Sequence, residues 1–347
     1  MSVGKWSPDD ASQRIVSGTG VSYLDGIKRQ RLRLLSRTAF FALFVLAPVL
    51  DVFRYDLTLG HAILFGHDWK LGLAPFESGV LDGGEASLRV LLRGFLPILL
   101  GAGLFLWLAW RYGRLYCGWL CPHFSVVETI NGLMRRASGK PSVWEPRPLP
   151  SRHPDGRPLP ADRLYWWPTV LVIVAMSLLW SVSLLTYLLP PAEIWGNLLR
   201  GELTRNQAIF ISVGVLAFTV EFTLARHLFC RYGCAVGIFQ SLAWMANRRA
   251  LVVKFDSAKA AECGSCFAAC DHACPMRLRP RGLKRHMFTC TQCTQCLSAC
   301  EAAQSSRGRT PLLTWVQGDE AAQISSFAAP RATAIHSAEA KPTESSV

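Results

Sequence analysis

The sequence predicts an all-α membrane protein of about four transmembrane helices, arranged as two repeated hairpins, with a small cysteine-rich domain and a disordered tail. Three observations predict this class. Half of the 347 residues are hydrophobic, only 18% are charged, and the mean hydropathy of +0.23 is typical of a chain that crosses lipid. All 12 cysteines lie in tight groups between Cys117 and Cys300. A C-x3-C motif occurs twice, each time after an apolar run.

The N-terminal segment, 1–36, is polar and basic and lacks the apolar core and cleavage site of a signal peptide. Seven Lys and Arg residues precede position 38 and nine lie in 111–165, whereas 54–93 and 190–207 hold four and two. The positive-inside rule therefore places both termini and the middle loop on the cytoplasmic side of the membrane. This distribution accounts for most of the net charge of +13, so no nucleic-acid partner is expected.

The expected transmembrane domain, 37–250, contains four apolar runs: 38–50, 94–110, 171–189 and 208–228. The last three approach or reach the 20 or so residues that a helix needs to cross a bilayer. The first has only 13 residues, which also suits an interfacial or re-entrant helix, but we count it as spanning. Between the second and third runs, 140–163 is rich in proline and is expected to be an extended cytoplasmic linker.

An internal repeat joins the two halves of this domain. The stretch Arg114-Leu-Tyr-Cys117-Gly-Trp-Leu-Cys121 matches His227-Leu-Phe-Cys230-Arg-Tyr-Gly-Cys234. Two hairpins related by an axis along the membrane normal would bring both cysteine pairs to one face. The four thiols, Cys117, Cys121, Cys230 and Cys234, could then form a dithiol relay, a copper site or an extra cluster, or be buried as small apolar residues.

Two further ionisable residues adjoin these motifs. His123 follows Cys121 by two positions and suits either an additional metal ligand or an exposed interfacial histidine. Glu221 lies inside the fourth apolar run, where a carboxylate is costly. It therefore suits a proton or quinol contact, or a polar partner within the helical bundle.

The strongest signal is an eight-cysteine block in the expected domain 251–306. Its second half has the C-x2-C-x2-C-x3-C spacing of ferredoxins, and its first half differs by one extra residue. In two-cluster ferredoxins the fourth cysteine of each motif ligates the other cluster. We therefore assign Cys263, Cys266, Cys270 and Cys300 to one 4Fe-4S cluster, and Cys290, Cys293, Cys296 and Cys274 to a second. Paired zinc sites are the alternative. Beyond this block, 307–347 is expected to be the disordered tail.

Over roughly 23–304 the chain resembles membrane-bound polyferredoxins of the CcoG, NapH and NosR type. The resemblance rests on the two C-x3-C motifs and the eight-cysteine block. It is nearest to the CcoG branch in Pro191-Ala-Glu193, although Ala235 stands where the family usually has proline and a short tail replaces the Ig-like domain of CcoG. The resemblance implies a multi-pass inner-membrane protein with a cytoplasmic 4Fe-4S domain that passes electrons to membrane or periplasmic acceptors. The CcoG branch implies copper reduction during assembly of cbb-type cytochrome oxidase.

We therefore expect an electron-transfer component of the oxidoreductase class, anchored in the lipid bilayer. Electrons would pass from a cytoplasmic donor through two 4Fe-4S clusters to a membrane or periplasmic redox enzyme. The alternatives are a cupric reductase or assembly factor for a cytochrome oxidase, and a redox-sensing metal-binding scaffold. A scaffold would hold its clusters without passing electrons on, so reoxidation of the reduced protein by an acceptor separates these classes.

Overall fold

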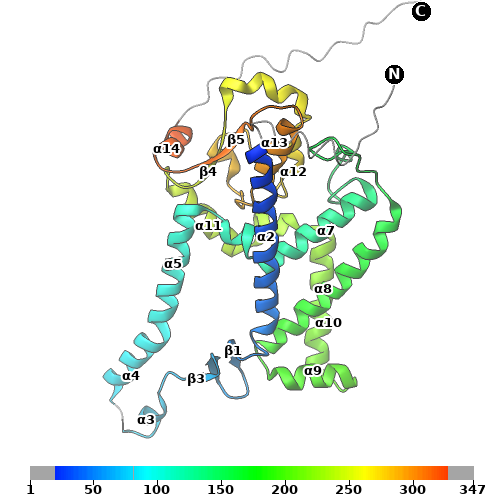
Figure 1. Cartoon of the computed structure of the whole chain (residues 1–347). Helices are drawn as coiled ribbons and strands as arrows, with labels where there is room; N and C mark the ends of the chain where they lie inside the picture. The colour runs from blue at the N-terminus through cyan, green and yellow to red at the C-terminus, as the bar shows by residue number, and fades with distance from the viewer. Residues whose placement is uncertain (1–19, 81, 327–347) are drawn as a thin grey trace, which may run out of the picture.

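The structure is a computed structural model that describes residues 20–80 and 82–326 (Figure 1). Helices dominate the described residues. Three of them are long and apolar enough to cross a membrane: Gly83–Tyr112, Arg163–Thr186 and Arg205–Ala225. They contain most of three of the four apolar runs that the sequence indicates. The chain therefore has helices suited to membrane association at these three positions.

The first apolar run belongs to the long helix α2, Gly20–Leu46. This helix ends four residues before the run does, in a turn over 47–50. Four arginines in its middle part keep it out of the set of helices that could span by length and composition. In Figure 1, α2 extends from the cysteine-rich region at one end of the molecule to the level of β1 at the other. A fourth span therefore remains a prediction.

The repeat forms two copies of one arrangement. In the first copy, α5 (Leu96–Tyr112) leads through the short α6 (Leu115–Trp119) into the amphipathic α7 (Pro122–Ser138). In the second, α10 (Arg205–Val220) and the π-helices η3 (Glu221–Ala225) and η4 (Phe229–Gly233) lead into α11 (Ala235–Ala246). The three helices that are long and apolar enough to cross a membrane are called the membrane-type helices below. The one between the two copies, α8 (Trp166–Thr186), packs along α10.

Each copy packs its last helix, α7 or α11, against helices of the other half of the repeat. Helix α11 packs against α5 of the other copy. Helix α7 packs against α8, and Val127 and Ile130 of α7 are completely buried together with Phe222 of η3. Figure 1 shows α7 and α11 as a layer at the upper ends of the membrane-type helices. This reciprocal packing is the pseudo-symmetry that a tandem repeat produces.

The opposite end of the molecule is small and partly β-stranded. Strands β1 (Phe53–Asp56), β2 (His61–Leu64) and β3 (His67–Trp69) form an antiparallel meander. The helices at this end follow in chain order: α3 (Ala74–Glu77), α4 (Gly83–Val90), π-helix η1 (Leu91–Phe95) and α9 (Pro191–Arg200). The meander departs from the all-α prediction, because two short turns at Gly60 and Gly66, both with positive φ, allow the chain to pair with itself.

The cysteine-rich region is folded around a second small sheet. Strand β4 (Val252–Phe255) pairs antiparallel with β5 (Leu313–Val316), with η5 (Ser257–Cys266), α12 (Ala269–Ala273), η6 (Lys284–Met287) and α13 (Gln295–Ser305) between them. Helix α14 (Asp319–Ser326) follows.

The prediction of a disordered tail from 307 is therefore wrong for 307–326. Leu312 and Leu313 are buried against the cysteine-rich core, which explains why this segment is ordered. Residues 327–347 and 1–19 lie outside the described part of the chain.

Candidate functional site

The four cysteines expected for the first cluster line one small cavity. Cys263 and Cys266 come from η5, Cys270 from α12 and Cys300 from α13, and apolar side chains such as Leu312 close the wall. The backbone N–H of Leu312 donates to Cys300 Sγ at 3.3 Å. Arg281 Nη1 reaches Cys263 Sγ at 3.6 Å. Both contacts place a hydrogen-bond donor against sulfur, as suits a bound thiolate.

The four cysteines expected for the second cluster line a separate cavity. They are Cys274, Cys290, Cys293 and Cys296. Gln292 and Thr294 have positive φ angles of 53° and 58°, so the loop curls tightly between its cysteines. The backbone N–H of Leu278 donates to Cys274 Sγ at 3.4 Å. The structure thus brings together the same crossed sets of four that the ferredoxin spacing predicts.

The geometry of each set distinguishes an iron–sulfur cluster from zinc. A zinc ion needs thiolate sulfurs about 2.3 Å from one centre. Within 20–80 and 82–326, no three His, Cys, Asp or Glu side chains form a group that could hold a metal ion. Four thiols around a common cavity, with amide donors to sulfur, instead fit a larger group with several metal atoms. The donor sets therefore suit 4Fe-4S clusters better than zinc.

Burial works against the thiolate form at cysteines of both sets, including Cys270, Cys274 and Cys290. Burial, with Cys293 as the next contribution, raises the pKa of Cys290 to about 12 and that of Cys274 to about 11. Because only thiolates ligate metal, cluster binding must expel these protons.

The four cysteines of the two C-x3-C motifs, Cys117, Cys121, Cys230 and Cys234, also form one group. We call them the membrane-edge cysteines, and the two motifs the membrane-edge motifs. In both copies the second cysteine, Cys121 or Cys234, is the N-cap of the helix that follows, α7 or α11. Burial, and then Cys121, raises the pKa of Cys117 to about 12, and Cys234 adds to the effect. Burial, Cys121, Cys117 and Cys234 also raise the pKa of Cys230. Each pair is thus within electrostatic reach of the other, as expected if both emerge on one face.

A buried arginine lies among these thiols. Arg114 is 1% exposed, and it donates to Ser241 Oγ at 2.6 Å and to the Cys230 carbonyl at 2.9 Å. Burial lowers the pKa of Arg114, and Cys117, Cys234, Cys230 and Cys290 act in the opposite direction but more weakly. Arg114 therefore links the membrane-edge thiols electrostatically to a cysteine of the second cluster set.

The membrane-edge motif touches the loop of the second cluster set directly. A Cβ on Gly118 would lie 2.1 Å from the Thr291 carbonyl oxygen and 3.2 Å from the Cys293 Cα, so only glycine allows this approach. The indole N–H of Trp119 donates to the Gln292 carbonyl at 3.0 Å. Backbone and side chain thus connect the C-x3-C motif to the ferredoxin-type loop.

The sequence suggests that His123 is either an additional metal ligand or an exposed histidine, and its environment in the structure differs from both. Its Nε2 lies 2.9 Å from Glu221 Oε2, and its Nδ1 lies 3.6 Å from Cys230 Sγ. Glu221 begins π-helix η3, a type of helix that is frequent at functional sites. His123 is therefore neither an exposed histidine nor part of a group that could hold a metal ion among the described residues. Glu221 has a polar partner within the helical bundle, which is one of the two alternatives that the sequence suggests, and that partner is His123.

Sequence reasoning missed the residues that fix α2 to this site. Arg33 and Arg37 both pair with Glu128 of α7, the latter at 2.6 Å. Arg33 also donates to the Gly118 carbonyl at 2.8 Å. The i, i+4 spacing of the two arginines places them on one helix face. This spacing is the feature of the sequence from which a shared partner could have been inferred.

Comparison with known protein families gives one match, found twice. A 4Fe-4S binding domain matches residues 95–141 and 207–253. Each match contains one C-x3-C motif and its flanking helices, and both lie outside the eight-cysteine block. The two matches support a 4Fe-4S ferredoxin-type family and iron–sulfur electron transfer, and they agree with the internal repeat. Comparisons with curated proteins and with solved structures give no match.

Proposed function

We propose that this chain is a membrane-anchored iron–sulfur electron-transfer protein of the inner membrane. It takes electrons from a cytoplasmic donor, passes them through two 4Fe-4S clusters and delivers them to a membrane or periplasmic acceptor. The observation that carries the proposal is the crossed grouping of eight cysteines into two four-thiol cavities. Three long apolar helices support membrane anchoring, and the distribution of positive charge supports a cytoplasmic location for both termini.

Bound 4Fe-4S clusters would supply one-electron redox chemistry. Cys263, Cys266, Cys270 and Cys300 would hold one cluster, and Cys274, Cys290, Cys293 and Cys296 the other. The remaining groups of the chain stabilise thiolates and exclude water. Amides of Leu278 and Leu312 donate to sulfur, and most of the other residues that line the two cavities are apolar.

The membrane-edge thiols are proposed as the next station on the electron path. They lie beside the second cluster set, joined to it through Gly118, Trp119 and Arg114. A further cluster or a dithiol relay at these four thiols would fit this position. The 4Fe-4S domain match over both C-x3-C motifs favours a cluster here.

A cupric reductase is the second candidate, because the four thiols of the two C-x3-C motifs lie within electrostatic reach of one another and soft thiolates favour Cu(I). In that reaction a bound, reduced cluster would supply the one electron that converts Cu(II) to Cu(I), and the cluster would be oxidised in the same step. Copper is then the substrate, and the protein returns to its oxidised state.

Transmembrane electron delivery tests the proposal. Protein reconstituted in vesicles is reduced from outside with dithionite while ferricyanide is trapped inside. We expect the trapped ferricyanide to be reduced faster than in protein-free vesicles. The Cys117→Ser/Cys121→Ser double variant should keep both ferredoxin-type clusters and lose this delivery. Equal rates with and without protein would contradict the proposed function, and full delivery by the double variant would remove these thiols from the path.

A further inference from the structure

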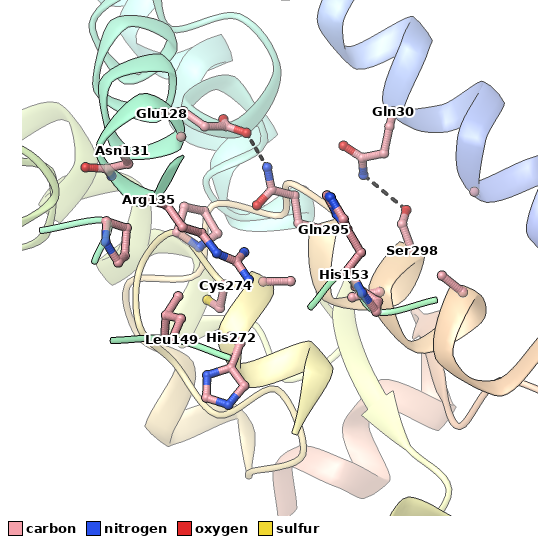
Figure 2. Close-up of a pocket in the computed structure, with 18 of the residues that line it drawn as sticks. Gln30, Glu128, Asn131, Arg135, Leu149, His153, His272, Cys274, Gln295 and Ser298 are labelled. Atoms are coloured by element: carbon pink, nitrogen blue, oxygen red, sulfur yellow. Dashed lines mark hydrogen bonds between the residues drawn. The ribbon is translucent and has the colours of Figure 1, made fainter. Parts of the chain in front are cut away.

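A cavity of about 740 Å³ lies beside the cysteine-rich region, between α2, α7 and the proline-rich linker (Figure 2). Its volume is within the range of small-molecule sites. Cys274 of the second cluster set forms part of its wall. The cavity is separate from the two four-cysteine cavities, and nothing in the electron path described above uses it.

The acidic side chains around this cavity are already neutralised. Glu128 pairs with Arg33 and Arg37 of α2. Asp155 pairs with Arg157 at 2.6 Å. No other Asp or Glu lines the cavity among the described residues. The wall therefore offers no free negative charge to a ligand.

A positive and incompletely satisfied group faces the same space. Arg135 Nε is buried and has no hydrogen-bond partner among the described residues, and Nη2 reaches the Pro150 carbonyl only at 3.5 Å. Figure 2 shows Arg135, His153 and His272 around the cavity, with Cys274 between them. Burial lowers the pKa of Arg135, and Arg277 lowers it further, so positive charge here lacks a counter-ion. A buried charged donor without a partner is costly, and a bound anion would offset that cost.

We propose that this cavity binds a small molecule that carries a phosphate group, with the Arg135 guanidinium as the main contact. The planar fork of arginine matches phosphate oxygens, and two histidines beside it supply further donors. Asn131, whose Oδ1 is also buried without a partner among the described residues, lies on the same wall and accepts from a hydroxyl of the ligand.

The phosphate group has two sources with the same chemistry. One is a soluble phosphorylated metabolite. The other is the headgroup of an anionic lipid, because Leu34 is shared with an apolar crevice lined by Phe41, Val172 and Met176 at the level of the membrane-type helices. A lipid chain would lie in that crevice while its phosphate reaches the cavity.

An anion in this cavity would also act on the neighbouring cluster. Negative charge against Cys274 opposes the addition of an electron, so ligand binding would lower the reduction potential of the second cluster. This effect rests on the proposed function, whereas binding itself does not. The site would then adjust the electron path to the supply of its ligand.

The binding test uses the full chain in phosphatidylcholine nanodiscs and radiolabelled pyrophosphate in equilibrium dialysis. We expect saturable binding that falls roughly tenfold or more in Arg135→Gln, from the loss of a charged hydrogen bond. Arg136→Gln is the matched control, because Arg136 is the next residue of α7, is exposed, and lies over the Tyr165 ring instead of the cavity. Its affinity should change less than twofold.

A second arm identifies the source of the phosphate. Nanodiscs that contain phosphatidylglycerol should displace pyrophosphate if the occupant is a lipid, and should leave its binding unchanged if the occupant is soluble. Either result supports the site, provided that pyrophosphate binding in Arg135→Gln is weaker by roughly tenfold or more. No saturable binding of either probe, or equal losses in Arg135→Gln and Arg136→Gln, would overturn the proposal. Iron content measured on the same samples shows separately whether the clusters are present.

Discussion

Replacing Gly118 by alanine tests whether the membrane-edge motif is held against the second cluster loop. The added Cβ would lie 2.1 Å from the Thr291 carbonyl oxygen, whereas ordinary contact begins at 3.4 Å. The obstructing atom is backbone, so it cannot rotate away. The motif and the loop must therefore separate by roughly 1 Å, a displacement on the scale of overpacked cores, which costs about 1–3 kcal/mol.

The expected result for Gly118→Ala is a lower unfolding temperature and faster loss of iron to a chelator. About 2 kcal/mol corresponds to roughly 4–8 °C in a chain of a few hundred residues. Both quantities can be followed in detergent by the visible absorbance of the clusters. Gly132→Ala is the control, since Gly132 is on α7 and a Cβ added there would have no neighbouring atom within 4 Å among the described residues.

Alanine at Gly132 should leave the protein unchanged or slightly stabilised, because alanine favours helix over glycine by up to about 1 kcal/mol. The reasoning is refuted if Gly118→Ala is as stable as Gly132→Ala and releases iron at the same rate. That outcome would mean that the motif does not press on the Thr291–Cys293 loop.

Three further predictions concern the ion pairs, the topology and the thiols. Glu128→Gln should destabilise the protein by about 3 kcal/mol in unfolding experiments, because it leaves two buried arginines without their carboxylate; Glu202→Gln, in an exposed pair, should cost under about 1 kcal/mol, and equal costs would contradict this account. A cysteine introduced at exposed Leu199 should react with an impermeant maleimide in spheroplasts and one at exposed Val143 only after lysis, and the reverse pattern would overturn the orientation. Iron and sulfide uptake by the apoprotein should increase from about pH 7 to about pH 9, because the raised pKa of Cys290 makes protons compete with iron; uptake independent of pH would contradict this competition.

Local spacing predicts the cysteine sets, and their role as cluster ligands stays a prediction. The positions of Cys263 to Cys300 predict two crossed groups of four, and the structure gathers the same groups around two cavities. Three of the four apolar runs likewise lie largely in helices long enough to span. Such features depend on the order and composition of short stretches, which the sequence states directly.

Features that depend on contacts between distant segments could not be predicted. His123 and Glu221 are 98 positions apart, and only the packing of α7 against η3 brings them together. The Gly118 contact with Thr291 depends on how the membrane-edge motif docks on the cysteine-rich region. The order of residues 307–326 could not be predicted for the same reason, since β5 is ordered by its pairing with β4, a strand some 60 residues earlier in the chain.

Metal and sulfide analysis of the anaerobically purified protein tests the central claim most directly. If both four-cysteine cavities hold clusters, the protein contains about eight iron atoms and eight acid-labile sulfides per chain, or about twelve of each if the membrane-edge thiols hold a third cluster. Dithionite should bleach the visible absorbance, and air should restore it. Zinc in place of iron, with no acid-labile sulfide, would contradict the account.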